Sequence, residues 1–217
     1  MALGVHTLLI SMSPFHNEFI PFKKVEGVLE ACRATGMGIF PWVEGFLPDL
    51  RSFSPETPHS LEEYETVFGP GYLNAIPGRY WITLRGRALA TYLPSMPVKP
   101  ISHILKESGG SCRELPDTSH FHMDLFGGYI PGLCSGLRIE AGDLGTELDQ
   151  DKYPHLALLF TKGIAGLLDY AVNKHGYEPE KNYVGKCDLC FRIRRYLVLD
   201  VGVDSIDLKP IRFYREV

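Results

Sequence analysis

The sequence predicts an α/β fold in two parts, and three observations carry that prediction. Apolar runs at residues 6–12 and 38–43 flank a stretch with apolar residues at helical spacing, which is the pattern of a strand, a helix and a strand. Hydrophobic residues make up 45% of the 217 residues and charged residues 22%, so the chain can bury a core. Beyond residue 100 the sequence changes, because glycine-rich segments and four of the five cysteines gather there.

Composition and charge argue against some classes of function. The net charge of −4 argues against a nucleic-acid partner, which a basic surface would attract. No apolar run approaches the roughly 20 residues that a membrane-spanning helix needs, so no membrane partner is expected. The first residues lack the basic region and the cleavage site of a signal peptide, which favours the cytoplasm, where thiols stay reduced.

The ends of the first elements can be assigned from single residues. Pro21 is suited to open a helix and Gly36 to end it, so a helix of about four turns is expected between the two apolar runs. A strand, a helix and a second strand form a βαβ unit, whose strands are parallel and whose crossover is right-handed. Residues 44–59 contain three prolines and predict a long loop.

Short elements are expected after that loop. Ser60 and Glu63 have the spacing of a capping box, which predicts a helix directly after Ser60. Residues 79–84 predict a third strand, and Gly86 begins a short helical piece after it.

The second part of the chain is expected to be a small α+β domain. Three prolines shortly before residue 101 place the domain boundary near residue 100, which assigns residues 1–100 to the first domain and 101–217 to the second. Within the second domain, residues 153–174 have helical periodicity with two glycines as bends, and residues 187–199 predict another helix.

The cysteines of the second domain are candidate metal ligands. Cys187 and Cys190 form a C-x-x-C pair at the start of a predicted helix, where the helix dipole favours the ionised thiolate. Cys112 and Cys134 lie in glycine-rich loops and raise the number of sulfur ligands to four. An iron–sulfur cubane and a structural zinc both require such a set.

Other interpretations of the cysteines stay open at this point. A zinc ion would use the same four thiolates, which would make the domain a zinc-stapled structural or binding module. A dithiol oxidoreductase could use Cys187 and Cys190 alone, although no thioredoxin-like context surrounds them. Cys32 lies on the apolar face of the first predicted helix and is expected to pack as a small hydrophobic residue.

Three further polar residues alternate along the sequence. His120, His122 and Asp124 would share one face of a strand, because alternate residues of a strand point the same way. Such a face could bind a second metal or line a substrate cavity, and the plain alternative is a solvated strand face. We treat the three as candidate substrate-binding residues.

Several segments together resemble one family. The middle of the barrel of radical S-adenosylmethionine enzymes is similar to LLISMSPFHNEFIPFKKVEGVLEACRATGM, and a later barrel element is similar to the GRA at residues 86–88. The family's C-terminal extension, of the type called twitch or SPASM, resembles HFHMDLFGGYIPGLCSGLRI and GKCDLCFRIRRYLV. The matching segments occur in the same order as in the family, and together they extend through nearly the whole chain.

The resemblance implies a fold and a set of ligands. It implies the C-terminal part of a partial (β/α) barrel, followed by a small α+β domain that binds an auxiliary [4Fe-4S] cluster. The cluster ligands would be Cys112, Cys134, Cys187 and Cys190. Ser11 matches a serine at the end of the family's fourth strand that helps to bind S-adenosylmethionine.

One motif of the family does not occur in this sequence. The C-x-x-x-C-x-x-C loop, whose cluster cleaves S-adenosylmethionine, is absent, so we do not expect this polypeptide to cleave S-adenosylmethionine by itself. The likeness begins at about the family's fourth strand. We therefore expect a fragment, a misassigned start or one piece of a split protein, with an upstream polypeptide that completes the barrel. The resemblance selects neither a catalytic residue nor a substrate, which could be a peptide or a small molecule.

Overall fold

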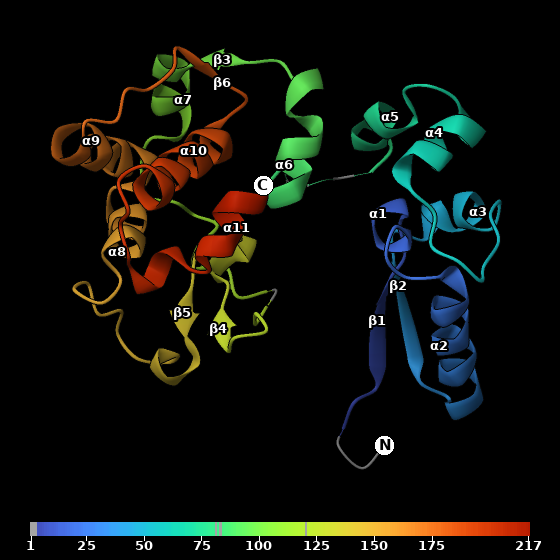
Figure 1. Ribbon diagram of the computed structural model, residues 1–217. Helices are drawn as coiled ribbons and strands as arrows, with labels where there is room; N and C mark the ends of the chain where they lie inside the picture. Colours follow the sequence, from blue (N-terminus) through green and yellow to red (C-terminus); the bar gives the residue numbers. More distant parts are fainter. Residues whose placement is uncertain (1–3, 81, 83, 120) are drawn as a thin grey trace. The chain divides into compact units, whose positions relative to one another are not determined.

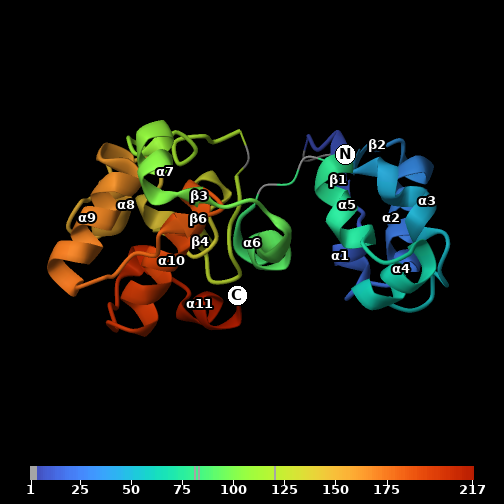
Figure 2. The ribbon, with the colours of Figure 1, turned by 90° about the horizontal axis from the view of Figure 1, so that it is seen from above.

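The structure, a computed structural model, describes residues 4–80, 82, 84–119 and 121–217. The chain contains both helices and short strands, which confirms the mixed α/β composition that the sequence predicts. The chain divides into two compact units, Met1–Trp81 and Ile82–Val217, which are described here one at a time (Figures 1 and 2).

The first unit begins with the expected strand, helix and strand. Strands β1 (Thr7–Ser11) and β2 (Gly38–Trp42) pair in parallel, and helix α2 (Phe22–Thr35) connects them (Figure 1). The helix follows Pro21 and ends at Gly36, whose φ of 67° is a left-handed conformation that glycine adopts without steric cost. The predicted strand, helix and strand are confirmed, because the signals at both helix ends are local.

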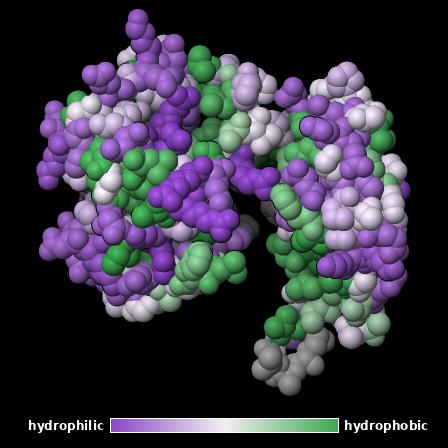
Figure 3. Space-filling view, in the orientation of Figure 1, coloured by the Kyte–Doolittle hydropathy of each residue, from purple (hydrophilic) through white to green (hydrophobic). Residues whose placement is uncertain are grey.

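The two faces of this small sheet differ. Ile10 of β1 is buried, as are Leu29 and Cys32 of α2, so the cysteine packs as the small apolar residue that the sequence predicts. On the opposite face, Leu9 and Phe40 lie directly across from each other and are 46% and 49% exposed. Figure 3 shows hydrophobic surface over these strands. Parallel sheets are normally covered on both faces, so this face is unusually open.

The segment after β2 is partly helical. A short 3₁₀ helix, η1 (Glu44–Phe46), runs into α3 (Leu47–Leu50), and the earlier helical turn α1 (Pro14–Asn17) follows β1. The prediction of a loop over 44–59 is therefore wrong in its first half. The physical reason is burial, because the helical turns carry both Phe46 and Leu50 into the core of the unit.

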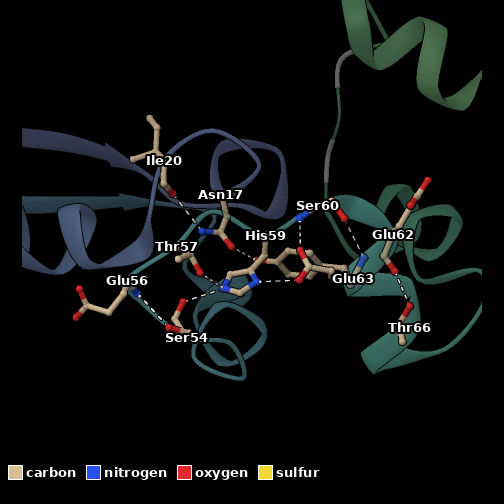
Figure 4. A network of polar contacts seen from close by, with 11 residues as sticks. Asn17, Ile20, Ser54, Glu56, Thr57, His59, Ser60, Glu62, Glu63 and Thr66 are labelled. Atoms are coloured by element: carbon tan, nitrogen blue, oxygen red, sulfur yellow. Dashed lines mark hydrogen bonds and ion pairs between the residues drawn. The ribbon is translucent and has the colours of Figure 1, made fainter.

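Helix α4 (Leu61–Phe68) begins where the capping box predicts. The Glu63 amide donates to the Ser60 hydroxyl at 3.2 Å, and the Ser60 amide donates to the Glu63 carboxylate at 2.6 Å. Figure 4 shows that His59 joins this network, with its ring nitrogens 2.9 Å from the Ser54 carbonyl oxygen and 3.3 Å from the Glu63 carboxylate. These bonds tie the preceding loop to the start of the helix.

The last helix of the first unit replaces part of a predicted strand. Helix α5 (Tyr72–Arg79) buries Tyr72 and Ile76, which are one helical turn apart. The strand predicted at 79–84 is not found among the described residues, because Arg79 belongs to this helix. Trp81 and Thr83, which lie inside the predicted strand, fall outside the described residues.

The second unit packs helices around one core. Its helices are α6 (Gly86–Tyr92), α7 (Ile101–Ser108), α8 (Pro154–Thr161), α9 (Gly163–His175), α10 (Lys186–Leu199) and α11 (Ile211–Glu216). Helices α8 and α10 both pack against α9 (Figures 1 and 2). The helix predicted over 153–174 is thus two helices that meet at a glycine, as the predicted bend requires, and α10 confirms the helix predicted over 187–199.

Very short strands and 3₁₀ turns complete the second unit. Its 3₁₀ turns are η2 (Leu93–Ser95), η3 (Pro131–Leu133), η4 (Ala141–Asp143) and η5 (Ile206–Leu208). Its strands pair antiparallel, β3 (Lys99–Pro100) with β6 (Asn182–Tyr183) and β4 (Gly128–Tyr129) with β5 (Ile139–Glu140). In the described ranges, the strands of the whole chain form three sheets of two strands each.

The start of the second unit lies before the boundary expected near residue 100. The segment around α6 packs with the second unit, since Arg85 donates to the Gly132 carbonyl oxygen and Ser135 lies close to Gly86.

Within the part of the chain that the structure describes, each helix is too short or too polar to cross a membrane.

Candidate metal centre

Four of the five cysteines line one cavity of the second unit. The space in this cavity that the centre of a water-sized sphere can occupy is about 40 Å³. The cysteines, called the cavity cysteines below, are Cys112, Cys134, Cys187 and Cys190. All four are partly buried, and apolar side chains form much of the remaining wall.

Two of the cavity cysteines come from the start of α10. Cys187 and Cys190 are three residues apart on this helix, so their side chains share one face of it. Asp188 between them is buried and holds the helix start, because its carboxylate accepts from the Val184 amide and from Arg192 Nε, both at 2.9 Å. Cys187 therefore lies in the first turn of α10, at the positive end of the helix dipole.

Cys134 follows a turn that few residues could make. Gly132 and Leu133, with φ of 56° and 58°, both have left-handed backbone, which costs a residue such as leucine about 1–2 kcal/mol. A Cβ atom on Gly132 would lie 2.3 Å from the Glu114 carbonyl oxygen, so glycine allows this close approach. The turn thereby brings Cys134 next to the segment that carries Cys112.

The Cys112 segment is held by the corner between α8 and α9. The Cys112 amide donates to the Leu159 carbonyl oxygen at 2.9 Å. At the corner, Gly163 has a φ of 63°, and a Cβ atom there would lie 1.7 Å from the Gly110 carbonyl oxygen. A larger residue at position 163 would push the Cys112 segment away from the corner.

Three cations line the same cavity, namely Arg85, Lys186 and Arg194. Lys186 Nζ lies 2.6 Å from both carboxylate oxygens of Glu114. Arg85 and Arg194 instead donate to uncharged oxygen atoms, and no carboxylate among the described residues forms an ion pair with either of them. The cavity therefore carries net positive charge when the thiols are neutral.

Burial raises the pKa of three of the cavity cysteines. It raises the pKa of Cys134 to about 12, raises the pKa of Cys190, and together with the neighbouring Glu114 carboxylate raises the pKa of Cys112 to about 11. Burial also opposes the charge of Glu114, but hydrogen bonds from Lys186 and from the Cys112 thiol lower its pKa to about 2. Metal binding to these cysteines would have to displace their protons.

The cysteines and cations of the cavity are residue types that an iron–sulfur cluster would need, but within the described residues they are not arranged as a metal site. A cluster with four thiolate ligands is anionic, and hydrogen bonds to its sulfur atoms stabilise it. The Nε atoms of Arg85 and Arg194 are buried without a hydrogen-bond partner in the described part of the chain, and such orphaned donors suit an anionic occupant. Among the described residues, no three His, Cys, Asp or Glu side chains are arranged to hold a metal ion as they stand, so binding would require the cysteines to draw closer.

The other predicted site residues lie elsewhere. Ser11 ends β1 in the first unit, where it is partly buried and opposite Trp42 in the sheet, whereas the cavity cysteines belong to the second unit. His122 is exposed, and neither it nor Asp124 lines the cavity. His120 falls outside the described residues.

The strand predicted around residues 120–124 is corrected by the structure. Among the described residues there, only Met123 forms a β-bridge, an isolated one with Tyr129. Asp124 closes a turn, because its carboxylate accepts from the amides of Phe126 and Gly128, both at 2.8 Å. Aspartate often makes such turns, since its short side chain reaches the nearby backbone.

Sequence reasoning missed two cations that line the cavity, Arg85 and Lys186, and the Glu114 carboxylate that pairs with Lys186. Arg85 lies far from the cysteines in the sequence, and Glu114 lies two residues after Cys112. Lys186 directly precedes the C-x-x-C pair, which is a signal that could have been used.

Comparisons of the chain with family models, with curated proteins and with solved structures find no match.

Proposed function

We propose that the second unit binds an auxiliary [4Fe-4S] cluster through the four cavity cysteines. The observation that carries the proposal is that these cysteines, from three separate segments of the chain, line one cavity together with three cations. The anionic cluster would balance the charge that the cations bring into the cavity.

The surroundings of Arg194 support an anionic occupant of the cavity. Its side chain is buried, and its hydrogen bonds go to the Ser135 carbonyl oxygen and the Tyr214 hydroxyl, which carry no charge. A buried cation without a counter-ion costs several kcal/mol. That cost is offset if thiolates of a cluster occupy the cavity beside it.

We also propose that the chain is the C-terminal portion of a radical S-adenosylmethionine protein. The first unit would supply later strands of a partial (β/α) barrel, in which Ser11 helps to bind S-adenosylmethionine. The parallel pairing of β1 with β2 supports this, and so does their open apolar face, which further barrel strands and helices would cover. An upstream polypeptide would then be the partner, and a peptide or a small molecule the substrate.

The cluster is tested by anaerobic reconstitution of the full chain with iron and sulfide. We expect about four irons and four sulfides per chain and an absorbance band at about 400 nm. Cys187→Ala and Cys190→Ala should each abolish both signals. Cys32→Ala is the matched control, because Cys32 is buried in the first unit, and it should load as much iron as the wild type.

The metal content of the purified protein decides between the cluster and the alternative, a zinc ion bound by the same four cysteines. Zinc would draw four sulfurs to about 2.3 Å from a single ion, and the protein would stay colourless. A colourless chain that binds one equivalent of zinc tightly, and that loses its fold on chelation, would contradict the cluster proposal.

A further inference from the structure

Arg194 lies beside two of the cavity cysteines. It follows Cys190 by one turn on α10, so the two side chains share a helix face, and Cys134 lines the same cavity. Arg194 is 5% exposed, and it lines the same cavity as these cysteines.

Its orientation is fixed by neutral partners. One terminal nitrogen of the guanidinium, Nη1, donates to the Ser135 carbonyl oxygen and to the Tyr214 hydroxyl, both at 3.0 Å. Tyr214 is itself buried, and its hydroxyl donates to the Gly136 carbonyl oxygen. These bonds connect α10, α11 and the turn after Cys134, and none of them neutralises the charge of Arg194.

The other basic residues near this helix start are different. Lys186 is paired with Glu114, and Arg192 is paired with Asp188. Arg195, the next residue after Arg194, is exposed and donates to the Tyr214 backbone carbonyl oxygen. Arg194 is therefore a buried positive charge next to the cysteines that no described carboxylate neutralises.

We infer that Arg194 sets the reduction potential of the proposed cluster, as a positioning residue that keeps an uncompensated positive charge against its Cys134 and Cys190 ligands. This inference rests on the proposed function. Reduction adds one electron to the cluster and moves no proton, so it makes the cluster more negative. A nearby cation in a poorly solvated site stabilises the reduced form more than the oxidised form, which raises the potential.

The experiment is a redox titration of the reconstituted full chain, with dithionite as the electron donor. Arg194→Gln removes the charge and keeps a polar side chain. We expect the ratio of reduced to oxidised cluster at a fixed potential to fall at least tenfold, which corresponds to a decrease of about 59 mV for one electron. The matched control is Arg195→Gln, which removes the same charge from the exposed side of the helix and should change that ratio less than about twofold.

A third variant separates charge from packing. Arg194→Lys keeps the charge, so we expect its potential to change much less than that of Arg194→Gln. If Arg194→Gln fails to load iron, a decrease of about 59 mV or more in a fully loaded Arg194→Lys protein would overturn the role of the charge. An unchanged potential in a fully loaded Arg194→Gln protein would overturn the role of Arg194 and leave the cluster in place. A wild-type chain that takes up no iron would overturn the cluster proposal itself and this inference with it.

Discussion

The two units of this chain bury apolar surface in different ways. In the first unit, two parallel strands are covered by α2 on one side, and Leu9 and Phe40 stay open on the other. In the second unit, α8, α9 and α10 enclose a core in which Leu156, Leu167 and Leu197 are fully buried. The comparison teaches that the second unit lines its cavity with residues of its own helices and turns, whereas the first presents a face that a further layer of structure would normally cover.

Two polar networks of the units differ in reach and in burial. In the first unit, the exposed capping network of Ser60 and Glu63 joins neighbours in the sequence. In the second unit, Asp207 is 0% exposed and accepts hydrogen bonds from the amides of His155 and Leu156 at 2.7 and 2.9 Å. The His155 ring nitrogen Nδ1 lies 3.0 Å from the same carboxylate. Asp207 thus holds the start of α8 from a distant part of the chain, and its loss should cost far more than the loss of a local cap.

The largest effect is expected at Asp207. Asp207→Ala leaves the buried His155 ring and two helix amides without their partner, so the free energy of unfolding of the second unit should fall by about 3–5 kcal/mol. Urea denaturation followed by circular dichroism measures the change. Asp204→Ala is the control, because its side chain is 75% exposed, and it should change stability by less than about 0.5 kcal/mol. Equal losses in the two variants would contradict the role of buried Asp207 in holding the start of α8.

The same carboxylate predicts a dependence on pH. Burial opposes its charge, but hydrogen bonds and attraction from His155, with a hydrogen bond from Ser205, hold the pKa of Asp207 below its usual range. Because this pKa is lower in the folded chain, the charge stabilises the fold above about pH 4, and this contribution is lost as the pH falls through the folded pKa. The difference in stability between the wild type and Asp207→Asn should therefore shrink below about pH 4. A difference that stays constant down to about pH 2 would contradict this assignment.

The next largest effect is expected for the Gly163→Ala substitution in the second unit, and Gly27→Ala in the first unit is its control. Gly163→Ala places a Cβ atom 1.7 Å from the Gly110 carbonyl oxygen at a φ of 63°, which should cost about 3 kcal/mol and lower the iron content by displacing Cys112. Gly27→Ala in α2 meets no atom within 4 Å and should gain about 0.5–1 kcal/mol, because alanine favours a helix. Thermal unfolding and iron assays measure both variants. A Gly163→Ala protein with wild-type stability and iron content would show that the corner does not hold the Cys112 segment.

The smallest effect is expected at the capping box. Ser60→Ala removes the hydroxyl that accepts from the Glu63 amide, so stability should fall by about 1 kcal/mol. Thr66→Ala is the control, because its exposed hydroxyl donates only to the Glu62 carbonyl oxygen inside the helix, and stability should stay the same or rise slightly. Urea denaturation again measures the change, and a greater loss in Thr66→Ala than in Ser60→Ala would break the assignment of the cap.

The predictions that succeed in the first unit depend on local chemistry. Pro21 and Gly36 bound α2 because proline suits a helix start and glycine suits the left-handed residue after a helix. The capping box succeeds for the same reason, since both of its bonds join residues three apart. The strand predicted at 79–84 fails where described because a helix buries Tyr72 and Ile76 together, and that gain depends on the rest of the unit.

In the second unit, α10 and the bend at Gly163 follow from the sequence, but the strand around residues 120–124 does not form where described. There, Asp124 bonds to its own backbone, and this turn competes with an extended strand. Alternation of polar and apolar residues is therefore a weak signal when a short aspartate side chain can satisfy nearby amides.

By itself, the sequence determined which residue types are available and where helices such as α2 and α4 begin, because such signals act over three or four residues. It singled out Cys112, Cys134, Cys187 and Cys190 by number and spacing. Only the tertiary structure decided that all four line one cavity and that Arg194 lies buried among them. The physical reason is that these contacts depend on how distant segments pack, through close backbone approaches at glycines and burial of one helix face, and no local pattern encodes that packing.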